Sequence, residues 1–335
     1  MIETNDLRKS FASVQKEPGI WGGIRGLWSR KTVVKEAVRG VSVRVGAGEM
    51  IGFLGPNGAG KTTTLKMLSG ILFPTSGAAS VLGYKPFDRH PDFLRQIALV
   101  MGQKQQLWWD LPARESLLLL KEIYSVSDAD YKTRLDEMTE LLDIGAILDV
   151  QVRKLSLGER MKCELVAALL HAPRVVFLDE PTIGLDVVSQ VRIREFLRTY
   201  QARNHATILL TSHYMQDVKE LCERVVIINH GEKMFDGAFA ELVSRYSDEK
   251  EVRLTFERAV PRPDIEAFGT VASMSDALHA VVRVPRESSA KRAGEMLAAL
   301  PVADIAIGEI EADEVIRALF TPEEAGGTND PAQPV

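Results

Sequence analysis

The glycine-rich stretch Gly55-Pro-Asn-Gly-Ala-Gly-Lys-Thr-Thr63 constrains the fold of this chain more than any other feature. It follows the apolar run 51–54 and precedes the helix-like run 64–68, so the order is strand, loop, helix. Its three glycines let the backbone curl with N–H groups pointing inward, and the following helix adds its positive N-terminal end. We expect the loop to hold a polyphosphate, with Lys61 reaching the β and γ phosphates and the Thr62 hydroxyl binding Mg2+.

Composition limits the possible functions of the chain. Its 335 residues carry a net charge of −5 with a pI near 5.8, and broad nucleic-acid binding usually needs a basic surface. The longest apolar runs, such as 117–120 and 175–178, are far shorter than the about 20 residues that cross a bilayer. The first ten residues carry charges and no apolar core, unlike a secretory signal. These features predict a cytosolic chain that does not bind nucleic acid.

A second motif is an apolar run that ends in two acids, Val175-Val-Phe-Leu-Asp-Glu180. Four apolar residues in succession are typical of a parallel strand that is buried on both faces. Asp179 at its carboxyl end is expected to hold Mg2+ opposite the phosphate loop, and Glu180 to polarise a water for attack on the γ phosphate. The alternative is a surface acidic pair, which the preceding apolar run disfavours.

A third motif is Leu155-Ser-Leu-Gly-Glu159, which precedes a helix-like run. Ser156 is a good N-cap residue, and Gly158 allows another backbone to approach closely. The motif therefore predicts a second helix end that can bind an anion.

In this order, the three motifs resemble those of ATP-binding cassette (ABC) proteins, the nucleotide-binding subunits of transporters. In that family the first motif is Walker A, the second is Walker B, and the third is the signature, usually written LSGGQ. Here the signature is LSLGE, so Leu157 and Glu159 depart from the common form. The resemblance covers residues 2 to 243 and implies an α/β P-loop NTPase cassette with a helical subdomain.

The resemblance also implies roles for single residues. Gln103 matches the Q-loop glutamine that senses Mg2+ and the attacking water, and Asp186 matches the D-loop aspartate that crosses to a second cassette. His213 matches the switch histidine that contacts the γ phosphate. Phe11 is similar to the aromatic residue that stacks on adenine, although a core Phe is the alternative.

The implied nucleotide-binding residues are Phe11, Gly55, Asn57, Gly58, Gly60, Lys61, Thr62, Thr63, Ser156, Gly158 and Asp186. The implied metal ligands are Thr62, Gln103 and Asp179, and the implied catalytic residues are Glu180, His213, Gln103 and Lys61. ATP and Mg2+ are the implied cofactors.

Changes in sequence pattern predict the domain organisation. The ABC domain spans residues 1–243, with an insert at 12–36 and a helical subdomain at about 92–170 that includes a largely buried helix over 116–124. Residues 244–321 follow a β-α-β-β-α-β pattern, which fits a small α+β module of the ferredoxin-like type. Residues 322–335 have little apolar content to bury and are predicted to be a disordered tail.

Two segments are candidates for contact with a membrane partner. The insert places Trp21 and Trp28 at helical spacing near basic residues, which favours either a membrane-facing amphipathic segment or packing on the parent domain. Trp108 and Trp109 follow the Q-loop, where cassettes receive the coupling helix of their membrane subunit. Internal packing of the helical subdomain is the alternative for this pair.

The pattern around WWDLP, LSLGERMKCEL and the appended module resembles the ABC-2 exporter group. This resemblance predicts an ATP-hydrolysing exporter subunit, peripheral at the cytoplasmic face of the cell membrane. Its predicted partners are separate ABC-2 type transmembrane permease subunits and a second cassette paired head to tail. The alternative is a soluble ABC ATPase that acts in translation or DNA repair. The sequence leaves open the transported substrate, homodimer versus heterodimer, and whether the C-terminal module binds a ligand or strengthens dimerisation.

Overall fold

The computed structural model describes residues 1–14, 32–102, 105–212, 214–246, 248–310 and positions 314, 316 and 320. It divides into two units, Met1–Gly237 and Ala238–Val335. The sequence pattern predicts a boundary after residue 243, whereas the contacts place it after Gly237, near the end of the last strand of the central sheet. Within the described residues, none of the helices has the length and apolar character needed to span a bilayer.

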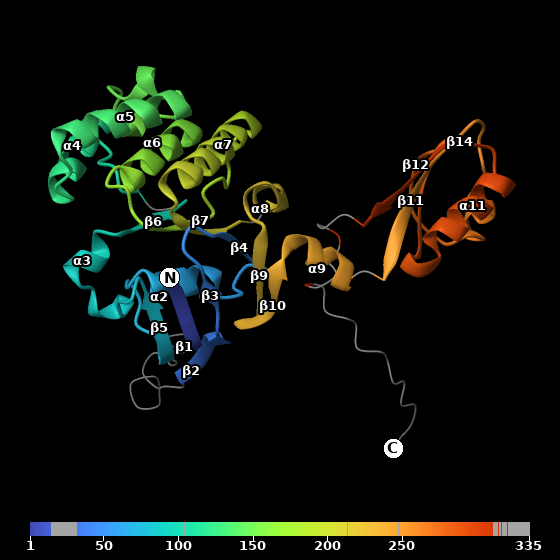
Figure 1. Ribbon diagram of the computed structural model, residues 1–335, viewed down its shortest axis with the longest axis horizontal. Coiled ribbons are helices and arrows are strands. Elements are labelled where there is room, and N and C mark those ends of the chain that lie inside the picture. The colour runs from blue at the N-terminus through green and yellow to red at the C-terminus, as the bar shows by residue number, and fades with distance from the viewer. Residues whose placement is uncertain are drawn as a thin grey trace, which may run out of the picture. The chain divides into compact units, whose positions relative to one another are not determined.

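The first unit is built around a six-stranded sheet with the order β10-β9-β4-β8-β7-β6 (Figure 1). Strands β9, β4, β8, β7 and β6 are parallel neighbours, and β10 is at the edge. The central strands are buried throughout because their apolar runs are covered on both faces. The strands are β4 Met50–Leu54, β6 Ile97–Met101, β7 Val175–Asp179, β8 Thr207–Thr211, β9 Arg224–Asn229 and β10 Glu232–Ala238.

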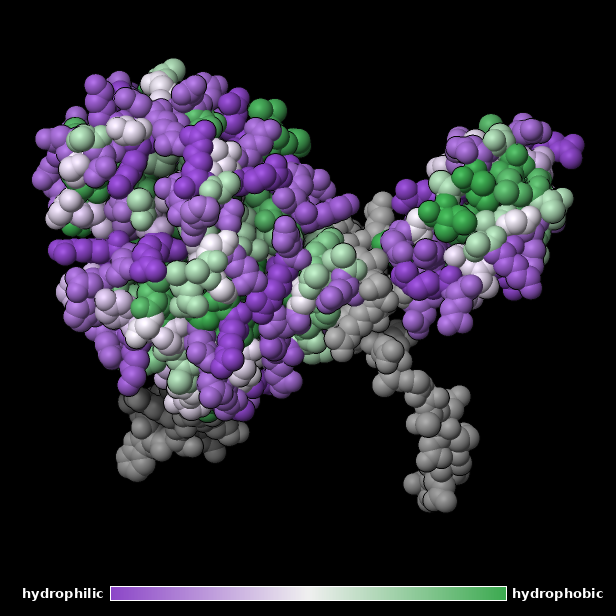
Figure 2. All heavy atoms as spheres, viewed as in Figure 1, coloured by the Kyte–Doolittle hydropathy of each residue, from purple (hydrophilic) through white to green (hydrophobic). Residues whose placement is uncertain are grey.

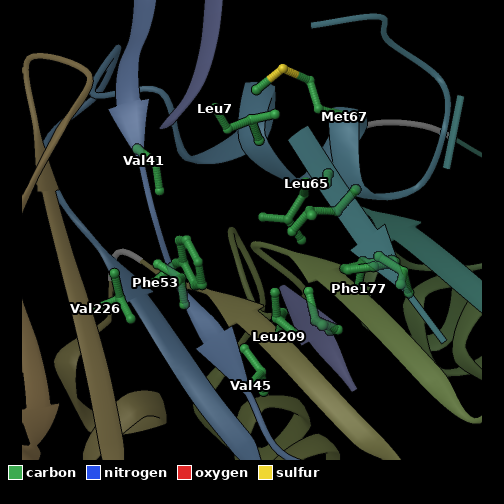
Figure 3. Packing of buried hydrophobic residues seen from close by; sticks show 14 of the residues in the cluster. Leu7, Val41, Val45, Phe53, Leu65, Met67, Phe177, Leu209 and Val226 are labelled. Carbon is green, nitrogen blue, oxygen red and sulfur yellow. The ribbon is translucent and has the colours of Figure 1, made fainter. Parts of the chain in front are cut away.

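A second, antiparallel sheet packs against the same core. Its strands are β1 Ile2–Val14, β2 Thr32–Val41, β3 Arg44–Val45 and β5 Ser76–Val81. Figure 3 shows Leu7 and Val41 from this sheet in one hydrophobic cluster with Phe53 and Phe177 of the central sheet. The cluster also contains Leu65 and Met67 of α2, so the helix that follows the glycine loop is anchored between the two sheets.

The helices of the first unit follow the predicted pattern with two corrections. They are α2 Lys61–Leu68, η1 Pro86–Asp88, α3 Pro91–Leu94, α4 Ala113–Ile123, α5 Asp128–Leu142, η2 Gly145–Ile147, η3 Val152–Lys154, α6 Leu157–Leu169, α7 Val187–Asn204 and α8 Met215–Leu221. The prediction that the helical subdomain starts near residue 92 is wrong, because β6 pairs with β7 in the central sheet. A short apolar run has no period that separates a strand from a buried helix.

The helix expected to be largely buried over 116–124 is also different. In α4, Leu117 and Leu120 are buried, whereas Leu118, Leu119 and Ile123 are exposed. The leucine run therefore covers two opposite faces of one helix, of which only one meets the core. Elsewhere, Figure 2 shows that hydrophilic side chains cover most of the visible face of the first unit.

The second unit contains the predicted β-α-β-β-α-β order. Its elements are α9 Phe239–Tyr246, β11 Glu249–Phe256, α10 Arg262–Glu266, β12 Thr270–Asp276, β13 His279–Pro285, η4 Arg286–Ser288, α11 Ser289–Ala299 and β14 Val302–Glu309. The antiparallel sheet has the order β12-β13-β11-β14, which is the split βαβ arrangement. Val252 and Leu254 of β11 pack with Met296 of α11 in a separate core.

Several sequence predictions fall on residues outside the described ranges. They concern most of the insert at 12–36, namely residues 15–31 with Trp21 and Trp28, the site residues Gln103 and His213, and the tail at 322–335. The two ends of the insert are described. There β1 and β2 pair as antiparallel strands, with Ala12 opposite Val34.

Candidate active site

The glycine loop joins the end of β4 to the start of α2, as the motif requires. Gly60 caps α2 in a left-handed conformation with φ of 106°. A Cβ atom at Gly60 would lie 2.4 Å from the carbonyl oxygen of Ala37, and one at Gly55 would lie 2.1 Å from that of Ile228. The loop is therefore packed directly against neighbouring backbone, which only glycine permits at these two positions.

Lys61 is buried at the mouth of this loop. Its Nζ atom donates hydrogen bonds to the carbonyl oxygens of Gly55, at 2.6 Å, and Pro56, at 3.1 Å. Burial lowers the pKa of the Lys61 ammonium, while the nearby carboxylates of Glu180 and Asp179 act in the opposite direction. Among the described side chains, no carboxylate lies within hydrogen-bond distance of this ammonium group. The buried cation therefore favours binding of an anionic group in the loop.

The structure brings Thr62 and Asp179 together across the sheet. The Thr62 hydroxyl donates to the Asp179 carboxylate at 2.9 Å, although 117 residues separate them in the chain. Within the described part of the chain, no group of three or more His, Cys, Asp or Glu residues forms a metal cage. A hydroxyl and one carboxylate are instead the kind of oxygen donors that suit Mg2+ shared with substrate phosphates, so these residues fit such an ion.

Thr211, which the sequence analysis did not assign, joins the two acids at the end of β7. Its hydroxyl donates to Asp179 at 2.8 Å and accepts the backbone N–H of Glu180 at 3.1 Å. Glu180 itself has a left-handed φ of 54°, a conformation that costs a non-glycine residue about 1–3 kcal/mol. The only sequence signal for Thr211 is that it ends a buried strand, and its partner depends on the register of β8 with β7.

Gln103 and His213 lie outside the described residues, but their flanking strands are described. Met101 and Thr211 are both register partners of Asp179, from β6 and β8 on either side of β7. The backbone N–H of Gly102 donates to the Asp179 carbonyl at 3.0 Å. Since the carboxyl ends of parallel strands meet at one edge of a sheet, both chain segments leave the sheet beside Asp179.

The signature motif forms a complete capping box at the start of α6. The Glu159 backbone N–H donates to the Ser156 hydroxyl at 3.3 Å, and the Ser156 N–H donates to the Glu159 carboxylate at 2.8 Å. Hydrogen bonds from Ser156 lower the pKa of Glu159. The unusual Glu of LSLGE therefore stabilises its own helix and places a negative charge beside Ser156.

The same helix start packs against the predicted D-loop. A Cβ atom at Gly158 would lie 2.5 Å from the Ser189 hydroxyl oxygen and 3.4 Å from an Asp186 carboxylate oxygen. Asp186 caps α7 by accepting the N–H and the hydroxyl of Ser189, and these bonds lower its pKa. Figure 1 shows α6 and α2 on opposite sides of the central sheet; Ser156 is the N-cap of α6, whereas Thr62 belongs to α2.

Phe11 lies on β1 opposite Lys35 of β2, and its ring is 41% exposed. This exposure is against the alternative of a buried core residue. Lys9 lies over the ring at 5.3 Å from its centre. Two residues beyond Lys35, β2 reaches Ala37, the residue that packs against Gly60. The ring is therefore carried by the strand pair that contacts the glycine loop.

Trp108 and Trp109 are 41% and 44% exposed and are held to the helical region. The backbone N–H of Trp108 donates to the buried Ser116 hydroxyl at 3.1 Å. The Arg160 guanidinium lies 5.4 Å from the centre of the Trp109 ring. The partly exposed rings favour an interface over internal packing for this pair.

Glu164 of α6, also missed from the sequence, fixes the backbone just before these rings. It is buried and accepts the N–H of Gln106 at 2.9 Å and of Leu107 at 3.3 Å. Burial raises the pKa of Glu164, and these two hydrogen bonds oppose the shift. Its sequence signal is an acid that directly precedes the apolar run 165–170.

Comparison with known families gives matches in both units. The family described as "ABC transporter" matches residues 38–183, and the one described as "EvrA-like ABC transporter, C-terminal domain" matches residues 248–308.

Individual relatives match about two thirds of the chain. The chain is 34% identical to the ABC transporter ATP-binding protein NatA of Bacillus subtilis (strain 168), over 69% of this chain and 92% of that protein. It is 38% identical to the Nod factor export ATP-binding protein I of Paraburkholderia xenovorans (strain LB400), over 63% of this chain and 68% of that protein. It is 33% identical to the linearmycin resistance ATP-binding protein LnrL of Bacillus subtilis (strain 168), over 69% of this chain and 73% of that protein.

Solved structures share the fold of about 70% of the chain. An ATP-binding subunit of an ABC transporter superimposes with a TM-score of 0.62 at 26% identity, over 73% of this chain and 92% of that chain. A dimeric ATP-binding cassette bound to ADP and Pi in a post-hydrolysis state gives a TM-score of 0.58 at 22% identity, over 71% of this chain and 98% of that chain.

Proposed function

The chain belongs to the ABC transporter family and is an ATP-hydrolysing cassette, and we propose that it powers an exporter whose transmembrane subunits are separate chains. The observation that supports ATP hydrolysis at this site is the hydrogen bond between Thr62 and Asp179, with Lys61 buried in the adjoining loop. It places a hydroxyl, a carboxylate and an ammonium around the mouth of a glycine loop, as binding of a metal-bound polyphosphate requires.

In the proposed mechanism, Glu180 polarises the attacking water, and His213 and Gln103 position it. Lys61 donates to the β and γ phosphate oxygens and stabilises the charge that develops on the transferred phosphoryl group. Thr62, Asp179 and Gln103 would hold Mg2+, which when bound neutralises charge on the phosphate oxygens. Thr211 fixes the carboxylate of Asp179 and the backbone of Glu180, so the two acids keep their places during the reaction.

Each ATP is proposed to bind between two cassettes. Helix α6 lies on the other side of the central sheet from α2 (Figure 1), so we infer that the helix end with Ser156 and Gly158 does not face the glycine loop of the same copy. A head-to-tail pair solves this problem, because Lys61 of one copy then meets the α6 start of the other. Phe11 is the proposed adenine-stacking residue, and the backbone of residues 55–63, with Asn57, Gly58 and Thr63, is the proposed phosphate cradle.

The exporter role rests on the relatives and on the aromatic pair. One relative is named for Nod factor export and another for linearmycin resistance, which favours export over the soluble alternative in translation or DNA repair. We assign Trp108 and Trp109 to the contact with ABC-2 type permease subunits. The chain would then be peripheral at the cytoplasmic face of the cell membrane.

The test combines ATPase activity with recovery of the membrane partner. Glu180→Gln should abolish hydrolysis and retain ATP binding, since only the group that polarises water is changed. Trp108→Ala/Trp109→Ala should lose a multi-span protein that wild type co-purifies from detergent-solubilised membranes, while keeping ATPase activity. Met234→Ala, which removes another exposed apolar side chain, is the matched control. Recovery of the same membrane protein by the tryptophan variant would refute the assigned interface.

A further inference from the structure

A buried carboxylate outside the proposed phosphate site joins the two loops that leave β7 and β8. Asp217 of α8 is 0% exposed. One of its oxygens accepts hydrogen bonds from the hydroxyls of Thr182 and Ser212, the latter at 2.7 Å. The other oxygen accepts from Arg194 at 2.9 Å. Three donors from three different parts of the chain therefore converge on one side chain.

The two hydroxyl donors are neighbours of proposed catalytic residues. Thr182 follows Glu180 by two positions, in the turn after β7. Ser212 lies between Thr211 and His213, and its hydroxyl also accepts the backbone N–H of Tyr214 at 3.0 Å. Asp217 thus holds the loop of the general base and the loop of the switch histidine to a common point.

The third donor balances the buried charge. Arg194 of α7 is buried and also donates to Glu220 of α8 at 3.0 Å. The helices α7 and α8 pack against each other in the first unit (Figure 1). An ion pair could serve to join these helices alone, and an apolar pair could do so equally well. The hydroxyls of Thr182 and Ser212 supply the further hydrogen bonds that the buried carboxylate needs, and they come from the loops after β7 and β8 and not from either helix.

We propose that Asp217 is a positioning residue for ATP hydrolysis, which sets the distance between the loop of Glu180 and the segment of His213. The proposal rests on the catalytic roles assigned to these two residues above. The proposal predicts that loss of the Asp217 carboxylate affects one step of the reaction cycle and not another. The glycine loop and Lys61 are held by other contacts, so a loss of Asp217 should affect the chemical step and leave ATP binding intact.

The experiment compares two carboxylates that share Arg194. Asp217→Asn keeps the volume but replaces one acceptor oxygen by an N–H2 group, whereas Glu220→Gln makes the same change without touching Thr182 or Ser212. We expect Asp217→Asn to lower kcat of the full chain about ten- to a hundredfold, as a displacement near 1 Å does, with an unchanged Kd for ATP. Glu220→Gln should retain the wild-type kcat.

A second variant removes the risk that Asp217→Asn does not fold. Thr182→Val deletes one hydroxyl and leaves the ion pair with Arg194 intact, and it should also lower kcat at constant Kd. Combining it with Asp217→Asn should lower kcat by less than the product of the two effects, because both act on one contact. Tm measured for every variant reports the purely structural contribution.

Four results would refute the positioning role or the mechanism on which it rests. An unchanged kcat in both Asp217→Asn and Thr182→Val refutes it, and so does a fall in kcat that Glu220→Gln shows equally and that follows Tm. If Glu180→Gln hydrolyses ATP at the wild-type rate, the proposed mechanism fails first. If Glu180→Gln is inactive and the Asp217 and Thr182 variants are normal, only the positioning role is wrong.

Discussion

His171 provides a quantitative prediction of how the stability of the cassette depends on pH. Its ring stacks on Tyr124 at the end of α4, with 3.8 Å between ring centres, and its Nε2 atom lies 3.1 Å from the carbonyl oxygen of Ile97. The Nδ1 atom is buried and has no hydrogen-bond partner among the residues that the structure describes. Burial lowers the pKa of His171 from 6.5 to about 4, against the opposing effect of the Ile97 carbonyl.

The sign follows from proton binding in the two states. Between pH 6.5 and 4 the unfolded chain protonates this histidine and the folded chain does not, so the free energy of unfolding falls as pH falls. The contribution is fully present above pH 6.5. At 1.36 kcal/mol per pKa unit, about 2 kcal/mol is lost between pH 7.5 and 5, and about 3 kcal/mol is lost by pH 4.

The perturbation is His171→Phe, which keeps an aromatic ring on Tyr124 and removes the titrating group. We expect wild type to lose about 2 kcal/mol more than the variant between pH 7.5 and 5. The assay is urea unfolding followed by tryptophan fluorescence, which reports on the first unit because all four tryptophans belong to it. The control is His90→Asn, which removes an exposed histidine and keeps a side chain that can cap α3. Equal pH dependence in wild type and His171→Phe would refute the reasoning.

Three further predictions concern ATP binding and hydrolysis. Thr211→Val removes the hydroxyl that holds Asp179 and should lower kcat about tenfold, roughly the loss of one hydrogen bond to a charged group; an unchanged rate would show that the strand end keeps its geometry alone. Glu159→Gln retains the cap but removes a negative charge at the α6 start, so it should tighten ATP-dependent dimerisation in light scattering, and weaker dimerisation would contradict this. Gly60→Ala adds a Cβ 2.4 Å from a backbone oxygen and should abolish ATP binding in nucleotide titrations, whereas near-normal binding would show that the loop can shift.

The local motifs of the site were predictable because each one is a continuous stretch with a strong conformational preference. The glycine loop, the apolar run before Asp179 and the cap at Ser156 all form as expected. The β-α-β-β-α-β order of the C-terminal module was predictable for the same reason, since alternating apolar residues mark each strand. By contrast, the run 97–101 gave no signal that separates an edge strand from a helix.

The sequence by itself predicted the glycine loop, the acidic strand end and the capped helix, because each is a short motif whose spacing sets its local geometry. Only the tertiary structure decided which side chains support them. Thr211, Asp217 and Glu164 act on segments that are 31 to 58 residues away in the chain. Such pairs depend on the register of parallel strands and on helix packing, which no local pattern encodes.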